Sequence, residues 1–429
     1  MNRYEILDTI RRTSIVDKRD YYLRLFKDPE INKLALNIQR GKLVSFLKRL
    51  RDNSFYKDYL EGISDLDIEE RPYDVLQSFP FSDKEILTNN YQHIRNPDYK
   101  GESCYTGGST GSPFHYYVGK DQLSSTIGFS MFLWSYLGNY KWNDSTVVVG
   151  GASVGDKQSL RNKALHFLQR RTYVSGGEIN PVNAEKLAKY INDSNRPVFL
   201  YGYPSSICQY LILFEELAIS INTDNIKSVL TTSEMLSDER KKVIEDYFHK
   251  DVINLYGARD GGISAGSKDN RFFIYNGIDC IAESVEIDGV KELVLTNLDS
   301  DAFPFVRYRN GDIASPVISN EGYPFLLTNI QGRTRDFIHL NHTEKVHGSQ
   351  INKVFKESSV VEYQIVQHED YRCEIRIQTK NDFTEKELLV LSDRIRQLLR
   401  DIPFQFVVVN SIERGKNNKL RNIISMVKE

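Results

Sequence analysis

Residues 105–113 read Tyr-Thr-Gly-Gly-Ser-Thr-Gly-Ser-Pro and lie between two runs that are typical of β-strands. The three glycines let the backbone turn with positive φ and approach a ligand closely. Successive N–H groups in such a turn form an anion-binding nest, and the hydroxyls of Thr106, Ser109 and Thr110 add donors. A Walker A loop would need GxxxxGK[ST], and the chain contains no such spacing. The stretch therefore predicts a different kind of loop that binds a chain of phosphates.

The residues around this loop predict an α/β fold. Before it, Leu, Ile and Phe recur at helical spacing in residues 31–36 and 43–50, which predicts helices over the first hundred residues. After it, apolar β-rich runs alternate with amphipathic stretches. Strands are predicted at 146–149, 198–201, 228–231 and 252–255, and helices at 183–192, 205–218 and 237–248. This alternation indicates a mostly parallel sheet with helices on both faces.

The last third of the chain changes texture twice. Closely spaced strands over 271–330 predict a compact β subdomain, and a polar run follows at 331–336. The pattern then restarts as a small α+β region. Its predicted elements are a helix at 349–356, strands at 361–367 and 372–378, a helix at 385–400 and a strand at 405–409. We therefore expect an N-terminal domain at 1–332, a hinge at 333–336 and a C-terminal domain at 337–429.

Composition excludes several classes of function. The chain has 429 residues and a formal net charge of -2, which argues against nucleic acid or an anionic membrane as its main partner. No apolar stretch approaches the roughly 20 residues that span a bilayer, and the first residues lack the apolar core of a signal peptide. The four cysteines are far apart with no CxxC pair, which argues against structural zinc. We expect a cytoplasmic protein without membrane insertion.

Thr106–Pro113 resembles the signature loop of the acyl-adenylate-forming (ANL) superfamily, in particular its phenylacetate–CoA ligase branch and the related capsule-polysaccharide adenylate ligases. Later motifs follow in the family's order, so the resemblance covers most of the chain. It implies a large N-terminal domain of parallel sheets with flanking helices and a β subdomain. It also implies a small mobile C-terminal α+β domain that rotates between two half-reactions.

The resemblance assigns ATP binding to the loop, through Gly107, Gly108, Ser109, Thr110 and Gly111, and makes Thr106 a catalytic candidate. Tyr256-Gly257-Ala258-Arg259-Asp260 resembles the family's Y-G-x-x-E. The resemblance places Tyr256 and Gly257 at the nucleotide and gives Asp260 to Mg²⁺. Asp260 is one methylene shorter than the usual Glu, so direct coordination and a water-bridged contact both remain open.

Three further motifs complete the implied nucleotide site. Ser233 and Glu234 resemble the segment that ends one side of the adenine pocket, although Ser-Glu before a helix is also a capping pattern. Asp312, in a match to Y-R-x-G-D, would accept hydrogen bonds from both ribose hydroxyls. Arg333, in a match to G-R-x-D-D-x-I, would reach the ribose or a phosphate, and the family's hinge falls at Arg335.

The C-terminal tail, Glu413–Ser425, resembles the family segment P-R-x-x-x-G-K-x-R that carries the adenylation lysine. Lys419 stands at the right distance from Arg414 and Arg421, with Asn418 in place of the usual Gly. Lys416 is the alternative because Gly415 precedes it. A lysine suits this role because its ammonium is a compact charge on a flexible stem.

The expected activity is ATP- and Mg²⁺-dependent conversion of a small carboxylic acid to an acyl-adenylate, followed by transfer to coenzyme A. Transfer to an amine is an open alternative. Tyr201, Tyr203, Pro204 and Ser205 border the implied acyl pocket and suit an aromatic or sugar-sized acid, though they also suit a core. A nucleotide-binding scaffold or sensor with impaired catalysis is a further alternative, suggested by the departures at 260, 335 and 418. The oligomeric state, a homodimer included, is left open.

Overall fold

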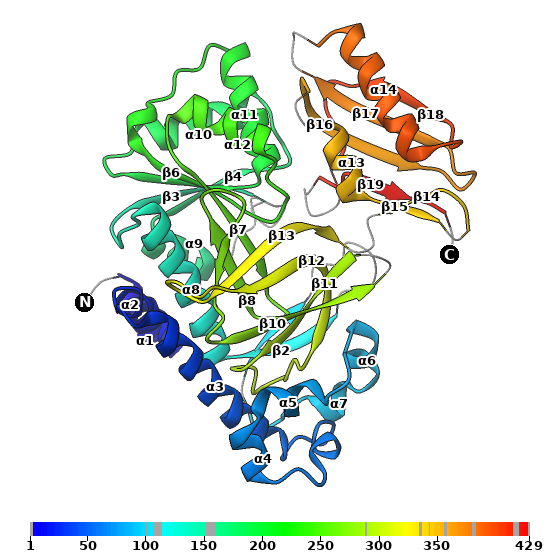
Figure 1. Ribbon diagram of the computed structural model, residues 1–429. Coiled ribbons are helices and arrows are strands. Elements are labelled where there is room, and N and C mark those ends of the chain that lie inside the picture. The colour runs from blue at the N-terminus through cyan, green and yellow to red at the C-terminus, as the bar shows by residue number, and fades with distance from the viewer. Residues whose placement is uncertain are drawn as a thin grey trace. The chain divides into compact units, whose positions relative to one another are not determined.

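The computed structural model describes residues 3–99, 101–105, 114–150, 160–287, 290–333, 337–342, 344–355, 358–379, 383–414 and 420–427 (Figure 1). Its contacts divide the chain into two compact units. The first comprises Met1–Asn143 and Ile253–Ile330, and the second comprises Asp144–Val252 and Gln331–Glu429. The division predicted from the sequence, with an N-terminal domain at 1–332, a hinge at 333–336 and a C-terminal domain at 337–429, remains a prediction.

The first unit begins with helices, as the apolar spacing predicted. They are α1 (Arg3–Arg11), α2 (Ile15–Leu25), α3 (Ile31–Leu50), a 3-10 turn (Lys57–Leu60), α4 (Asp65–Glu70), α5 (Pro72–Gln77), α6 (Lys84–Asn89), α7 (Tyr91–Ile94) and α8 (Lys120–Gly138). Side-chain caps start two of them. Ser64 and Asp67 form a reciprocal capping box at α4, and the Asp83 carboxylate accepts the Ile86 N–H at α6.

A β-hairpin flanks the glycine-rich loop. Strands β1 (Gly101–Tyr105) and β2 (His115–Gly119) pair antiparallel, and Tyr105 lies opposite His115. The His115 ring is hydrogen-bonded on both sides, with Nδ1 3.0 Å from the Tyr91 hydroxyl and Nε2 2.9 Å from Ser103 Oγ. These bonds fix the end of the hairpin from which the loop departs. The loop itself, 106–113, lies outside the described residues.

The β subdomain predicted near 271–330 is present as part of a larger sheet in the first unit. Its strands are β7 (Val252–Ala258), β8 (Ile263–Ser267), β9 (Phe273–Tyr275), β10 (Cys280–Ile287), β11 (Val290–Asn297), β12 (Tyr308–Ile318) and β13 (Phe325–Arg333). They lie in the order β10-β11-β12-β13-β9-β8-β7. Pairing is antiparallel between β7 and β8, β8 and β9, β9 and β13, β10 and β11, and β11 and β12.

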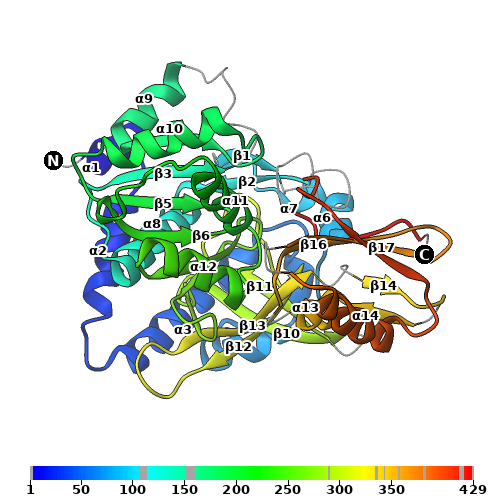
Figure 2. The ribbon, with the colours of Figure 1, turned by 90° about the horizontal axis from the view of Figure 1, so that it is seen from above.

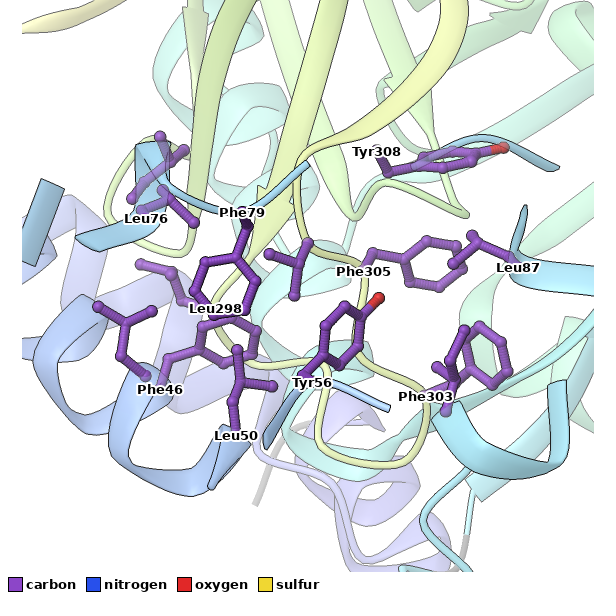
Figure 3. Close-up of a cluster of buried hydrophobic side chains, with 14 of the residues drawn as sticks. Phe46, Leu50, Tyr56, Leu76, Phe79, Leu87, Leu298, Phe303, Phe305 and Tyr308 are labelled. Atoms are coloured by element: carbon purple, nitrogen blue, oxygen red, sulfur yellow. The ribbon is translucent and has the colours of Figure 1, made fainter. Parts of the chain in front are cut away.

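A buried aromatic cluster joins the first helices to the chain just before β12 (Figure 3). Phe46 and Leu50 come from α3, and Phe303 and Phe305 come from the segment between β11 and β12. Tyr308, the first residue of β12, lies at the edge of this cluster and is 3% exposed (Figure 3). The cluster therefore holds the start of β12 in place.

The second unit contains the predicted parallel sheet. Strands β3 (Ser145–Gly150), β4 (Arg171–Ser175), β5 (Val198–Gly202) and β6 (Ile226–Thr231) are parallel and lie in the order β6-β5-β3-β4. Figure 2 shows β3, β5 and β6 side by side. Gly202 is required at this pairing, because a Cβ there would lie 2.3 Å from the Val149 carbonyl oxygen.

Helices follow these strands in alternation. They are α9 (Leu160–Gln169), α10 (Pro181–Asn192), α11 (Pro204–Glu216), a 3-10 turn (Thr223–Asn225) and α12 (Asp238–Phe248). Apolar residues of α10, α11 and α12 pack with those of β3, β5 and β6 in one core. Asn180 caps α10 and Ser237 caps α12 through their side chains. The predicted α/β class is thereby confirmed.

The C-terminal residues of the second unit form the expected small α+β body. Its elements are β14 (Phe337–His339), β15 (Lys345–His347), α13 (Gly348–Phe355), β16 (Val360–Gln367), β17 (Cys373–Thr379), α14 (Glu385–Leu399), β18 (Phe404–Val408) and β19 (Ile423–Ser425). The sheet order is β18-β17-β16-β19. β19, which pairs parallel to β16, lies beyond the last strand that the period predicts, at 405–409, and is an apolar strand after Lys419.

All four cysteines are free and buried, in agreement with the absence of a CxxC pair. Burial raises the pKa of the Cys208 and Cys373 thiols to about 12, so both remain protonated near neutral pH. Within the described residues, no helix has the length and apolarity needed to cross a bilayer.

The aromatic cluster supplies a stability prediction. Phe79 is 1% exposed, and its ring centroid lies 5.6 Å from that of Tyr59, so Phe79→Ala removes contacts and leaves a cavity. The free energy of unfolding should fall by about 3–5 kcal/mol, measured by urea titration. Leu66→Ala is the control, because Leu66 is 61% exposed and its truncation should change little. Equal losses in the two variants would contradict this account of the core.

Candidate active site

Two carboxylates of the first unit are each held by a tyrosine hydroxyl. Tyr256, in β7, donates its hydroxyl to Asp312 Oδ2 at 2.7 Å. Asn310 Nδ2 donates to the same oxygen at 3.0 Å and to the Tyr256 hydroxyl at 3.0 Å. The structure thus brings together two residues that the sequence placed in separate motifs.

In the second pair the two strands exchange roles, with the tyrosine in β12 and the aspartate just after β7. Tyr308, at the start of β12, donates its hydroxyl to Asp260 Oδ2 at 3.0 Å, and Asp260 follows the end of β7. Sequence reasoning did not assign a role to Tyr308. The available signal was its place as the first residue of the Y-R-x-G-D match. Gly257 follows Tyr256 in β7. A Cβ at this position would lie 3.3 Å from the Ile263 carbonyl oxygen, which is a tight contact.

Burial controls the ionisation of these tyrosines. Burial raises the pKa of Tyr256 well above its ordinary value, and the Asp312 carboxylate raises it further. The pKa of Tyr308 is raised by burial and then by Asp260. Tyr116 in β2 is also affected, because burial and then Asp260 raise its pKa. Its buried hydroxyl has no hydrogen-bond partner among the described residues.

This arrangement fits a magnesium ion that arrives with a nucleotide. Within the described residues, no three His, Cys, Asp or Glu side chains are grouped so that they could hold a metal ion. Mg²⁺ is commonly bound through one or two carboxylates together with substrate phosphates and water. One carboxylate, Asp260, oriented by Tyr308 and near the orphaned Tyr116 hydroxyl, suits such a partial ligand set.

The predicted acyl-pocket residues lie in the second unit, where β5 ends and α11 begins. Tyr201 is in β5, Tyr203 precedes α11, and Pro204 is its first residue. Pro204 suits that position because its missing N–H would have no partner in the helix. Ser205 is fully buried, and its N–H donates to Glu234 Oε2 at 3.3 Å.

Glu234 lies among protein partners. Its Oε1 accepts the Leu420 N–H at 3.0 Å and lies 3.5 Å from Arg414 Nη1. Arg414 also donates to Ser205 Oγ and, at 3.0 Å, to Glu362 Oε1. Ser233, which precedes Glu234, is in the left-handed region at φ 69°. Sequence reasoning missed Glu362 and the partners of Arg414, since nothing local links positions so far apart.

Several predicted site residues belong to segments beyond those that the structure describes. The loop residues 106–111, the hinge residue Arg335 and the two candidate lysines, Lys416 and Lys419, lie outside the described residues. Arg333 ends β13, but its side chain is likewise outside the description. Their roles remain predictions that rest on the motifs.

Solved structures identify the class of the fold. A 2-hydroxyisobutyryl-CoA ligase in the postadenylation state, in complex with 2-HIB-AMP, matches with a TM-score of 0.68 and 16% identity over 92% of this chain and 90% of that chain. The same ligase with 2-HIB-AMP and CoA in the thioesterification state gives a TM-score of 0.53 and 18% identity over 92% and 90%. An anthranilate CoA ligase in complex with anthranoyl-AMP gives 0.51 and 13% over 75% and 66%.

The chain therefore shares the fold of these CoA ligases, which is the fold that the resemblance of the loop and the later motifs implied. Within it, residues 338–426 match the CapK C-terminal domain family. No curated protein sequence matches the chain.

The tyrosine–aspartate pairs predict an unusual alkaline titration. An ordinary tyrosine ionises near pH 10, and the raised pKa of Tyr256 keeps it neutral there. Tyrosinate absorbance of the native wild type and of Tyr256→Phe should therefore coincide from about pH 8 to 11. In concentrated guanidinium chloride the variant should titrate one tyrosine fewer. A native difference near pH 10 would contradict the raised pKa of Tyr256 in this pair.

The raised pKa of Tyr256 also determines how the free energy of unfolding depends on pH. A pKa raised on folding stabilises the protein fully below the unfolded pKa, and this contribution is lost as the pH rises through the folded value. Replacing Tyr256 by Phe should thus make stability less dependent on pH above about 10.

Proposed function

We propose that the protein is an AMP-forming ligase that uses ATP to convert a carboxylic acid to an acyl-adenylate and then transfers the acyl group to coenzyme A. The supporting observation is the pair of tyrosine–aspartate hydrogen bonds. They fix the side chains of Asp260 and Asp312, the two acids to which the motif resemblance assigns the metal and ribose contacts. The ANL fold supports the same activity.

In the first step an oxygen of the substrate carboxylate attacks the α-phosphorus of ATP. The bond from that phosphorus to the bridging oxygen breaks, and pyrophosphate leaves. No enzyme nucleophile is needed, so positioning and charge neutralisation supply the catalysis. Asp312, fixed by Tyr256 and Asn310, is proposed to hold the ribose, with Tyr256 and Gly257 beside the adenine. Mg²⁺ bound at Asp260 would neutralise charge on the phosphates.

The remaining predicted residues act on the phosphates and the carboxylate. Residues 107–111 are proposed to cradle the phosphate chain, with Thr106 beside the reacting phosphate and Arg333 on the ribose or a phosphate. Lys419, or Lys416 in the alternative alignment, would bridge the carboxylate and the α-phosphate. Ser233 is proposed at the adenine pocket, whereas the contacts of Glu234 favour a role with the C-terminal tail.

In the second step a thiol sulfur attacks the acyl carbon, the bond from that carbon to the phosphate oxygen breaks, and AMP leaves while the thiol proton is released. An amine acceptor would give an amide by the same exchange of bonds. The match of residues 338–426 to the CapK C-terminal domain favours this second candidate. The acid is proposed to lie near Tyr201, Tyr203, Pro204 and Ser205. The need for ATP and the four free thiols support a cytoplasmic location.

Acid-dependent exchange of labelled pyrophosphate into ATP tests the first step. The protein, ATP and Mg²⁺ are mixed with phenylacetate, anthranilate, 2-hydroxyisobutyrate or glucuronate in turn. At least one aryl or sugar acid should support exchange. Exchange with none across a wider panel of both kinds would favour a nucleotide-binding scaffold. Coenzyme A or free amines, added with an active acid, then distinguish a thioester from an amide.

Asp312→Asn tests the ribose role. Loss of a charged acceptor should weaken ATP binding by about tenfold to a hundredfold, measured by calorimetry. An unchanged affinity for ATP would remove Asp312 from the nucleotide site.

The alignment of the tail has its own test. Lys419→Ala should reduce pyrophosphate exchange by at least about a hundredfold with ATP affinity retained, because the charge acts on the transition state. Lys416→Ala is the matched control. If Lys416→Ala abolishes exchange and Lys419→Ala does not, Lys416 is the adenylation lysine.

A further inference from the structure

Four charged side chains form a buried cluster in the second unit: Glu234, Arg240, Glu362 and Arg414. Their side chains are 5%, 11%, 0% and 7% exposed. Two carboxylates face two guanidiniums, so the cluster is neutral as a whole. Buried charges are retained only when paired, because desolvation of an unpaired ion costs several kcal/mol. Loss of any one of these four side chains would therefore leave a buried charge without its partner.

Glu362, in β16, is the centre of the cluster. Its Oε1 lies 3.0 Å from Arg414 Nη2 and 3.8 Å from Arg240 Nη2. Its Oε2 accepts a hydrogen bond from Gln209 Nε2 in α11 at 3.1 Å. Arg240, in α12, also donates to the Val361 carbonyl oxygen at 3.3 Å. Through these contacts β16 is tied to the helices that follow β5 and β6.

Glu234 binds the chain on both sides of the segment 415–419. Before that segment it pairs with Arg414 at 3.5 Å, and after it Oε1 accepts the Leu420 N–H at 3.0 Å. Its other oxygen accepts the N–H of Ser205, in the first turn of α11. One carboxylate thus joins the start of α11 to the residue before and the residue after this segment.

Gln364, also in β16, binds the same two flanks from the C-terminal sheet. Its Nε2 donates to the carbonyl oxygen of Arg421 at 3.0 Å and to that of Glu413 at 3.5 Å. Arg376 Nη1 donates to Gln364 Oε1 at 3.2 Å and orients the amide. The flanks of 415–419 are therefore held from two directions, by Glu234 and by Gln364.

We infer that Glu234 is a positioning residue for the adenylation step, which acts through Arg414 and Leu420 on the C-terminal tail, and that the buried charge cluster exists to hold it there. The inference rests on the proposed function, since the tail is proposed to carry the adenylating lysine. It gives Glu234 a different role from that of the adenine-pocket residue which the motif implies. Arg414 and Glu362 act through Glu234 and the tail in the same way.

The test compares Glu234→Ala with Lys227→Met. Lys227, in β6, pairs with Asp144 at 2.9 Å in the same unit and has no hydrogen bond or ion pair with the described part of the tail, so its variant controls for general loss of an ion pair. Hydrogen–deuterium exchange is followed at the Leu420 amide. Pyrophosphate exchange is followed with ATP and whichever of phenylacetate, anthranilate, 2-hydroxyisobutyrate or glucuronate the wild type uses fastest. ATP affinity is measured by calorimetry.

In Glu234→Ala, the Leu420 amide should exchange at least about tenfold faster, because it loses a bond to a charged acceptor. The kcat of pyrophosphate exchange should fall at least about tenfold, with ATP affinity within about twofold of wild type. Lys227→Met should change neither quantity. Arg414→Lys should lose activity as well, since an ammonium cannot replace the fork that binds Glu362 and Ser205 together.

Two results would overturn the inference: unchanged Leu420 exchange in Glu234→Ala, or weaker ATP binding with kcat retained, which marks a nucleotide contact. A third result is distinguishable from both. If the wild type supports no acid-dependent pyrophosphate exchange, the proposed function fails and the positioning role fails with it. Faster hydrogen exchange of the Leu420 amide in Glu234→Ala would then show only that the contact between Glu234 and Leu420 exists.

Discussion

The tyrosine–aspartate pairs of the first unit cross between the same two strands in opposite directions. Tyr256 of β7 binds Asp312 of β12, and Tyr308 of β12 binds Asp260 after β7. In the sheet order, β13, β9 and β8 separate these strands, so the sheet must curve back for both bonds to form. Partly buried carboxylates without such donors would cost free energy. The positions of both acidic groups therefore depend on the curvature of the β subdomain.

In the second unit, acidic side chains are also fixed by distant partners, but here the partners are arginine guanidiniums and not tyrosine hydroxyls. Glu362 has no exposed side-chain surface, and burial raises its pKa while Arg240 and Arg414 act in the opposite direction. Each acid is fixed by partners from distant parts of the sequence. In the adenylation that we propose, which requires no enzyme nucleophile, such fixed positions are what the protein would contribute to the rate. In that account, polar contacts between residues far apart in the sequence, and not any single side chain, connect the fold to the proposed chemistry.

The sequence predicted the elements well where they have a clear period. The strand at 198–201 and the helix at 205–218 were found within two residues, because an apolar run and an amphipathic stretch follow one another. It could not predict the pairing of Glu234 with Arg414, since contacts across 180 positions leave no local pattern. The hydroxyl bond of Tyr256 to Asp312 was hidden for the same reason. The loop and the tail lysines rest on motifs alone.

The most direct test of an acyl-adenylate is the fate of a carboxylate oxygen. An acid that supports pyrophosphate exchange is labelled with ¹⁸O in its carboxyl group and converted with ATP and the acceptor, and the nucleotide product is analysed by mass spectrometry. Attack on the α-phosphorus transfers one labelled oxygen to AMP, and this is the result we predict. Label in inorganic phosphate, with ADP as the nucleotide product, would contradict the account.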